Sequence, residues 1–346
     1  MKTTTIATTV LLLAAAALPG AAQETRRLRV LATTTDLAAL CREVGGEAVE
    51  VSCLMTGPED PHFLDARPAY ARRAADADLF VKTGLDLEIG YEVPIVRDAR
   101  NARIQPGAAG YCDASAEVDR LEVPTTAVDR SQGDVHSLGN PHYLADPVRA
   151  AVAGRTIAAS LGRVDPARAK EYAARAEEFG RRVDEALFGA EILGKAPARR
   201  LARLLAEGRL AAWLEEKDLG GSLGGWAKDL LPAAGKEVVV YHANFSYLLD
   251  RFHIACDLRL EAKPGIPPSP SHVRSVVEAM RARSIPAVLC AVFHPKAVPE
   301  GVAAETGAKV VVLEHMPGAL GRAEDYLAFV DGNVKALAAV LGKGKR

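Results

Sequence analysis

The sequence predicts an α/β protein of two lobes, each with a mostly parallel sheet, joined by a long rigid helix. Short apolar strands alternate with helical segments in two separate stretches of the chain, and a helical stretch without strand signals lies between them. Alternation of this kind builds a parallel sheet covered by helices. The 346 residues are enough for two domains of ordinary size.

The first half supplies the elements of an N-terminal lobe, residues 23–145. Leu28 to Ala32 is a buried strand, and the helix start Thr33-Thr34-Thr35-Asp36 leads into the apolar-periodic run Leu37 to Val44. Val49 to Met55 alternates like a strand, and Asp78 to Lys82 is a short apolar strand entered from a helix rich in Ala and Arg.

The middle of the chain, residues 146–190, is predicted to be a helical linker. Asp146-Pro147 and Asp165-Pro166 both place a capping residue before a Pro in the first turn, which favours a helix start. From Pro166 to Phe188 there is no further Pro and the apolar spacing is helical. A helix of that length would span ~34 Å at ~1.5 Å per residue and could hold two lobes apart rigidly.

The second half is predicted to form a C-terminal lobe, residues 191–346, with a helical insertion at about 194–235. Its expected strands are Glu237 to Tyr241, Ile254 to Leu260, Ala287 to Phe293 and Lys309 to Leu313, and its expected helices are Ser271 to Arg283 and Tyr326 to Leu341. The polar stretch Glu117 to Gly139 has no periodicity and is interpreted as a surface loop.

The first 22 residues are predicted to be a signal peptide. An apolar segment follows Lys2, and Gly20-Ala21-Ala22 offers the small residues that signal peptidase requires, so cleavage is expected after Ala22. A lipid anchor would need a Cys at the cleavage point, whereas the first Cys is Cys41. We therefore expect a periplasmic protein without a lipid anchor; an uncleaved anchor helix is the alternative.

The net charge of −1, or −2 after loss of Lys2, argues against nucleic acid as a partner, because phosphate binding needs a basic surface. None of the five Cys lies in a CxxC pair, which argues against a Cys-based metal site. Disulfides Cys53–Cys112 or Cys256–Cys290 are conceivable, and buried free thiols are the alternative.

Three of the eight His have an informative context, and two of them lie beyond the carboxyl ends of strands, where ligands bind in open α/β sheets. His62 follows the strand that ends near Met55, His242 directly follows a strand of the second half, and His142 precedes the Asp146-Pro147 helix start. A site drawn from both halves would lie in a cleft between them. Three His with one carboxylate or water form a normal tetrahedral zinc site.

The fourth ligand is predicted to be Glu314, which follows the last strand. His315 beside it, His294 after the preceding strand, and water are the alternatives. Glu261 also follows a strand, but a structural role is favoured. His136 is expected on a mobile, solvated loop, and His253 and His272 are expected to be structural.

The motifs that carry these His resemble those of the zinc/manganese-type solute-binding proteins of bacterial ABC importers. The matching segments are Glu59-Asp60-Pro61-His62, Gly139-Asn140-Pro141-His142-Tyr143-Leu144-Ala145-Asp146-Pro147, Tyr241-His242 with the aromatic helix after it, and Lys263-Pro264-Gly265-Ile266-Pro267-Pro268-Ser269. The resemblance implies two α/β lobes, a metal buried between them, and His62, His142 and His242 as its ligands. The family usually has an Asp where this chain has Glu314, and its zinc members often carry a His-rich loop of which only His136 is present.

The sequence thus predicts a non-enzymatic, monomeric protein that captures zinc, with manganese less favoured, and delivers it to the permease of an ABC importer in the inner membrane. Manganese sites favour more oxygen ligands, whereas ligand type alone leaves copper and nickel open. The alternatives are a zinc-dependent hydrolase, for which no HExxH helix or nucleophile constellation is visible, and a metallochaperone or adhesin on the same fold.

Overall fold

A computed structural model describes residues 26–126, 133, 136–321 and 325–342. The predicted signal peptide, residues 1–22, lies outside the described residues. Within the described part of the chain, no helix is both long enough and apolar enough to cross a membrane.

The N-terminal lobe contains a parallel sheet with strand order β2-β1-β3-β4. Its strands are β1 (Leu28–Ala32), β2 (Val49–Cys53), β3 (Leu79–Lys82) and β4 (Tyr111–Asp113). The first three are the strands predicted from the sequence, within two residues at each end. The edge strand β4 was not predicted, because three residues are too few to show a periodicity.

The C-terminal lobe repeats this arrangement with strand order β6-β5-β7-β8, again all parallel. Its strands, all predicted, are β5 (Glu237–Val240), β6 (Ala255–Arg259), β7 (Ala287–Ala291) and β8 (Lys309–Leu313). In each sheet the first strand of the lobe lies between its second and third strands, so the lobes share one topology and the two-lobed α/β fold class is confirmed.

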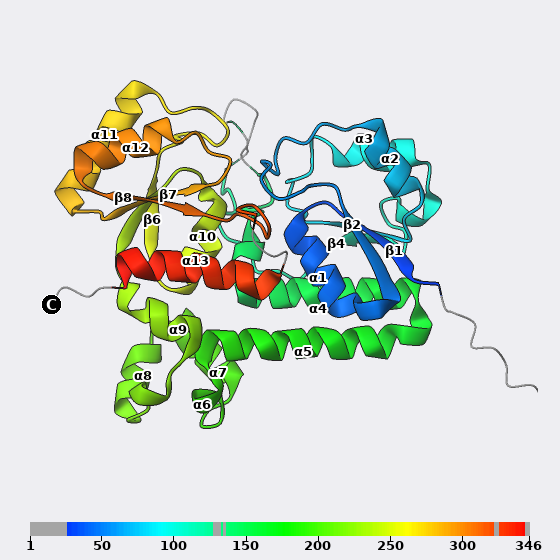
Figure 1. Cartoon of the computed structure of the whole chain (residues 1–346), viewed down its shortest axis with the longest axis horizontal. Coiled ribbons are helices and arrows are strands. Elements are labelled where there is room, and N and C mark those ends of the chain that lie inside the picture. Colours follow the sequence, from blue (N-terminus) through cyan, green and yellow to red (C-terminus); the bar gives the residue numbers. More distant parts are fainter. Residues whose placement is uncertain (1–25, 127–132, 134–135, 322–324, 343–346) are drawn as a thin grey trace, which may run out of the picture.

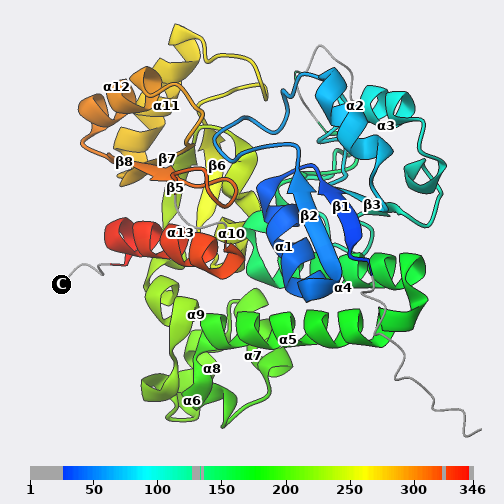
Figure 2. The same cartoon turned by 45° about the vertical axis from the view of Figure 1, so that its right-hand side comes forward.

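Helices cover both faces of each sheet, as a parallel sheet requires. The N-terminal lobe carries α1 (Thr35–Gly45), α2 (Pro68–Ala75) and α3 (Glu92–Ala99), and the C-terminal lobe carries α10 (Ser246–Arg251), α11 (Pro270–Arg283), α12 (Ala297–Thr306) and α13 (Tyr326–Leu341). Figures 1 and 2 show the two lobes side by side, with α2 and α3 on the outer side of one lobe and α11 and α12 on the outer side of the other.

Two long helices connect the lobes. Helices α4 (Pro147–Val164) and α5 (Ala169–Phe188) pack against each other and run below the N-terminal lobe in the view of Figure 1. The 20 residues of α5 span about 30 Å, so the predicted joining helix is present, although it begins at Ala169 after a 3-10 turn. The predicted insertion then forms short helices beside and below one end of α5 (Figure 1), namely α6 (Ala190–Leu193), α7 (Ala198–Ala206), α8 (Leu210–Glu216) and α9 (Gly225–Leu230).

One hydrophobic core runs through both lobes. Alternate residues of the strands point into it, such as Val30 and Ala32 of β1 and Val238 and Val240 of β5, and they meet α1, α4, α5, α9 and α13 there. The intervening residues Leu31 and Val239 point instead into two smaller cores under the outer helices. Because the central core is shared, the lobes are held as one body.

All five cysteines are free, so neither of the conceivable disulfides is formed. Cys41, Cys112 and Cys290 are buried, and Cys53 and Cys256 are half-buried. Burial raises the pKa of the Cys112 thiol to about 11, which keeps it protonated and unreactive at neutral pH.

Candidate metal centre

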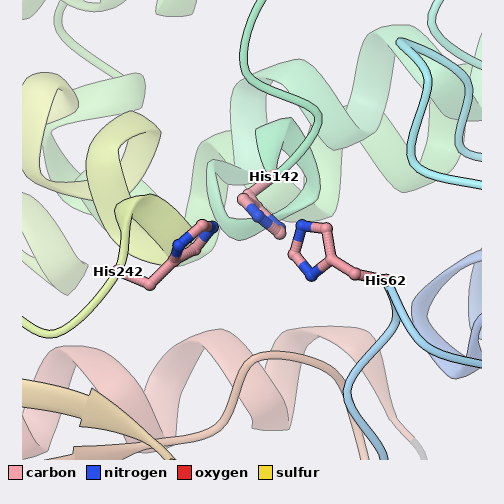
Figure 3. Close-up of side chains that lie close together, drawn as sticks. All are labelled: His62, His142 and His242. Atoms are coloured by element: carbon pink, nitrogen blue, oxygen red, sulfur yellow. The ribbon is translucent and has the colours of Figure 1, made fainter. Parts of the chain in front are cut away.

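The structure brings His62, His142 and His242 together between the lobes. One ring nitrogen from each lies within 4.8 Å of the other two, and among the described residues these three alone form such a group. The ring centroids are 5.1 to 5.4 Å apart. Figure 3 shows the three imidazoles converging from three different parts of the chain. The sequence prediction that these three residues are neighbours is therefore correct.

The loop after β2 presents His62 through a network of its own acidic residues. The Glu59 carboxylate accepts hydrogen bonds from the backbone N–H groups of Thr56 and Gly57, at 3.0 and 2.8 Å, which closes the turn. Asp60 Oδ1 accepts from the His62 backbone N–H at 3.0 Å and lies 2.7 Å from His62 Nδ1. With Nδ1–H donating to Asp60, the lone pair of His62 is on Nε2, which is buried and has no hydrogen-bond partner.

Asn140 fixes the loop that carries His142. Its Oδ1 accepts from the His142 backbone N–H at 2.8 Å, and its Nδ2 donates to the Ala243 carbonyl at 3.0 Å. The Asn140 carbonyl in turn accepts from the Tyr247 hydroxyl at 2.7 Å. Since Ala243 directly follows His242, this side chain fastens the His142 loop to the His242 segment.

Asp146 provides a second fastening just after His142. It caps α4 by accepting from the Val148 N–H at 3.1 Å, and it forms an ion pair with Arg251 at the end of α10, at 2.6 Å. Its side chain is fully buried. The helix that begins at Pro147 and the helix that follows His242 are thus tied at the same carboxylate.

His242 follows β5 and is oriented by Glu261, which follows β6. The Glu261 Oε2 atom lies 2.9 Å from His242 Nδ1 and also accepts from the Gly265 N–H at 3.1 Å. As at His62, a carboxylate takes the Nδ1 proton and leaves the Nε2 lone pair for a ligand. Hydrogen bonds of this kind set the tautomer and ring orientation of metal-binding histidines. The sequence favoured a structural role for Glu261, and its role in the structure is to orient His242.

The surroundings of His142 favour its neutral form. Burial, followed by the charges of His62 and His242, lowers the pKa of His142 well below its ordinary value. Burial also raises the pKa of Asp60 to some extent, but the hydrogen bond and charge of His62 outweigh it and lower that pKa overall. Because a metal binds only the unprotonated imidazole, the lowered pKa of His142 leaves its nitrogen lone pair available at neutral and mildly acidic pH.

Glu314 lies directly after β8, as predicted, but it is not a member of the group of three. Its side chain is buried, and Oε1 accepts from the Leu320 N–H at 2.9 Å, across the loop that follows β8. Its backbone N–H donates to Asn333 on α13 at 2.9 Å. The carboxylate therefore shapes this loop, and its role as fourth ligand stays a prediction.

The alternatives His294 and His315 have different hydrogen bonds. His294 Nδ1 accepts from the Ala291 N–H at 3.0 Å, which leaves the proton of the neutral ring on Nε2 and no lone pair for a metal. His315 Nε2 donates to the Glu59 carbonyl at 2.9 Å, and its buried Nδ1 has no hydrogen-bond partner. His315 thereby joins the C-terminal lobe to the loop of His62.

His136 is not the solvated loop residue that the sequence suggests. Its ring centroid lies 5.3 Å from that of His62 and 6.5 Å from that of His142, and its Nε2 is buried. A single His in a polar loop gives no sequence signal for such packing. His253 and His272 are structural, as expected, with Nε2 atoms 2.6 and 2.8 Å from the carbonyls of Leu205 and Arg259.

Comparison with known proteins gives a family match over most of the chain. Residues 30–190 and 224–340 match the family model described as zinc-uptake complex component A, periplasmic. The unmatched residues between them fall in the helical insertion. The iron-binding protein YfeA of Yersinia pestis is 24% identical over 324 residues, which cover 92% of this chain and 88% of that protein.

Other relatives and structures carry the names of different metals. The manganese ABC transporter substrate-binding lipoprotein PsaA of Streptococcus pneumoniae serotype 4 is 21% identical over 53% of this chain and 57% of its own. Among solved structures, a zinc-bound deletion mutant of ZnuA has a TM-score of 0.68 at 18% identity, covering 92% of this chain and 100% of its own. The binding protein FpvC of P. aeruginosa with Ni²⁺ has a TM-score of 0.66 at 20% identity, covering 93% and 100%. These likenesses show a shared fold.

Proposed function

We propose, from the premise that this chain belongs to the zinc-uptake complex component A family, that it captures zinc in the periplasm and delivers it to an ABC-type importer. The family match and the relatives make it a metal-binding component of ABC metal uptake. The choice of metal and the residues that hold it are our proposal. The observation that carries it is the group of three imidazoles between the lobes.

The ligand chemistry supports zinc. Imidazole nitrogen suits zinc, whereas manganese prefers carboxylate, carbonyl and water oxygens. The three converging groups are all imidazoles, and the two nearby carboxylates, Asp60 and Glu261, are each engaged with a ring Nδ1. The metals named for the relatives are iron, manganese, nickel and zinc, so those names do not decide the metal of this chain.

The proposal also covers the location of the protein, its oligomeric state and the boundaries of its lobes. We propose that the mature protein is a periplasmic monomer without a lipid anchor, that it meets a permease in the inner membrane, and that its lobes are divided at residues 145 and 190 by the linker. Relatives such as PsaA are named lipoproteins. Release by osmotic shock, rather than retention in the membrane fraction, is the outcome that would support an unanchored protein.

The proposed ligands are tested by metal titration of the chelator-stripped mature protein, with zinc and manganese in competition. One tight zinc per chain is expected. His142→Ala and His242→Ala should each weaken zinc binding by orders of magnitude, because two imidazoles hold zinc far less tightly than three.

His272→Ala is the matched control, because His272 is bonded to the Arg259 carbonyl and is not one of the three converging residues. Wild-type zinc affinity in both the His142 and His242 variants would reject the site. Tighter binding of manganese than of zinc would reject the choice of metal.

A further inference from the structure

We propose that His136 is the fourth metal ligand, so that the site is made of four imidazoles. This inference rests on the function proposed above and adds a residue that neither the family match nor the sequence pattern assigns. The observation behind it is the position of the His136 ring beside His62, with its Nε2 buried and without a hydrogen-bond partner. A buried polar nitrogen without a partner is costly unless something binds it.

The other nitrogen of His136 is already occupied. The ring donates a hydrogen bond to the backbone carbonyl of Asp86, and because Nε2 has no partner, the donor is Nδ1–H. His136 therefore repeats the arrangement of His62 and His242, in which an oxygen accepts from Nδ1 and the Nε2 lone pair is left for a ligand. Histidines that bind metals have this pattern almost without exception.

The backbone next to His136 is also held in place, through its neighbour Ser137. Asp86 Oδ2 accepts from the Ser137 hydroxyl at 2.6 Å, so Asp86 fastens two consecutive residues of the segment. Leu85 and Asp86 both have positive φ, 53° and 67°, which is unfavourable for residues with side chains. Backbone conformations of this kind cluster at functional sites, and here they occur at the residue that interacts with both His136 and Ser137.

The other candidates for the fourth position fit less well. Glu314 Oε1 is bonded to the Leu320 N–H. His294 has its lone pair directed at the Ala291 N–H. His315 retains a lone pair on Nδ1, but the described ring contacts of His315 include Phe293 and none of the three converging histidines. His136 also lies outside the group of three, but it combines an unpartnered Nε2 with ring contacts to both His62 and His142.

Four neutral ligands leave both positive charges of the metal uncompensated in the first coordination sphere. Asp60 and Glu261, hydrogen-bonded to His62 and His242, supply two negative charges one bond further out. A carboxylate ligand such as Glu314 is then not required for charge balance. The inference also sharpens selectivity, since four nitrogen donors disfavour manganese more than three nitrogens and one carboxylate do.

The test compares the metal-stripped wild type with His136→Ala, Glu314→Gln and Leu138→Ala by competitive zinc titration and by the visible spectrum of the Co²⁺-loaded protein. Leu138 lies on the same segment, is 46% exposed, and serves as the matched control. His136→Ala should weaken zinc binding by more than the roughly 10–100-fold that loss of an outer partner costs. It should also change the Co²⁺ spectrum, which reports the ligand set directly.

A rescue experiment distinguishes a His136 that binds the metal from a His136 that only supports the fold. Free imidazole added to His136→Ala should occupy the vacated position and restore the Co²⁺ spectrum toward that of the wild type. Wild-type affinity and spectrum in His136→Ala would overturn the inference, as would a spectrum changed by Glu314→Gln and unaltered by His136→Ala. In both cases the proposal of a three-histidine site would stand. A wild-type protein that binds no metal would instead contradict the three-histidine site and the role of His136 alike.

Discussion

Two carboxylates decide which nitrogen each of two histidines can offer. Asp60 and Glu261 accept from Nδ1 of His62 and His242, so in both rings the lone pair that the proposed metal would use is on Nε2. These carboxylates come from different lobes, one from the loop after β2 and one after β6. Each lobe therefore orients its own ligand before the two meet.

Removing the Glu261 carboxylate should weaken the site without removing a ligand. In Glu261→Ala the Nδ1–H of His242 loses its acceptor, and the ring loses both its fixed orientation and a compensating charge. We expect zinc affinity to fall by roughly 10–100-fold, measured by competition with a chromophoric chelator. Glu278→Gln on the exposed face of α11 is the control. An unchanged affinity in Glu261→Ala would show that the hydrogen bond contributes nothing to binding.

At the scale of elements, the three converging histidines lie on loops, while strands and long helices fix where those loops begin or end. His62 and His242 follow β2 and β5, and His142 precedes α4. Parallel strands direct their carboxyl ends to the same edge of a sheet. The packing of α4 against α5 then keeps the two edges at a fixed separation.

Two glycines near the linker should respond to substitution in opposite ways. Gly180 lies inside α5 with open space where a Cβ would be, so Gly180→Ala should stabilise the protein by about 0.5–1 kcal/mol through helix propensity. Gly225 has a φ of +57°, and a Cβ there would lie 2.2 Å from the Ala186 carbonyl oxygen, so Gly225→Ala should destabilise it. Urea unfolding of the metal-free variants measures both. A less stable Gly180→Ala would mean that this turn of α5 is not regular helix.

The elements were largely predictable because their signals are local. Strands such as Lys309–Leu313 and the helix Tyr326–Leu341 have the predicted bounds, since alternation and helical spacing are visible within each segment. His62 and His242 were predictable because strand ends have a known place in such sheets, and His142 was predictable from its motif before the Asp146-Pro147 helix start. His136 was not, because its position depends on the contact of its segment with Asp86, 50 residues earlier, and no local pattern encodes that contact.

At the scale of the molecule, the shared core makes the lobes interdependent. Residues of both sheets meet α4 and α5 in one continuous cluster, so neither lobe can unfold without exposing apolar surface of the other. The loop contacts across the cleft add to this, since His315 donates to the Glu59 carbonyl and Thr35 donates to the Pro317 carbonyl. We infer that metal release proceeds through loop movement and small lobe shifts.

The free energy of unfolding should depend on pH through buried His294, and a substitution of this residue isolates its contribution. Burial, followed by the charge of His242, lowers the pKa of His294 from 6.5 to about 3. As the pH falls below 6.5, the unfolded chain takes up a proton at this residue and the folded chain does not, so this contribution to stability is lost between pH 6.5 and about 3. His294→Asn removes it, while an amide oxygen can still accept from the Ala291 N–H.

The free energy of unfolding of metal-free His294→Asn, relative to the wild type, should therefore rise as the pH is lowered from 7 to 4.5. Urea titrations at both pH values measure it, and the comparison cancels the opposing contributions of buried Asp36 and Glu88, whose pKa values burial raises to about 6 and about 7. An equal difference at both pH values would show that His294 titrates normally in the folded protein.

The three converging histidines span 180 residues of chain, from His62 to His242. A nascent chain that ends before β5 contains two of them and lacks the third. On the proposed ligand set, the complete site therefore forms only once both lobes have been synthesised and packed, and bound metal would then stabilise the native state alone. The proposal thus makes metal loading a late event in the life of the polypeptide, one that a truncated copy could not reach.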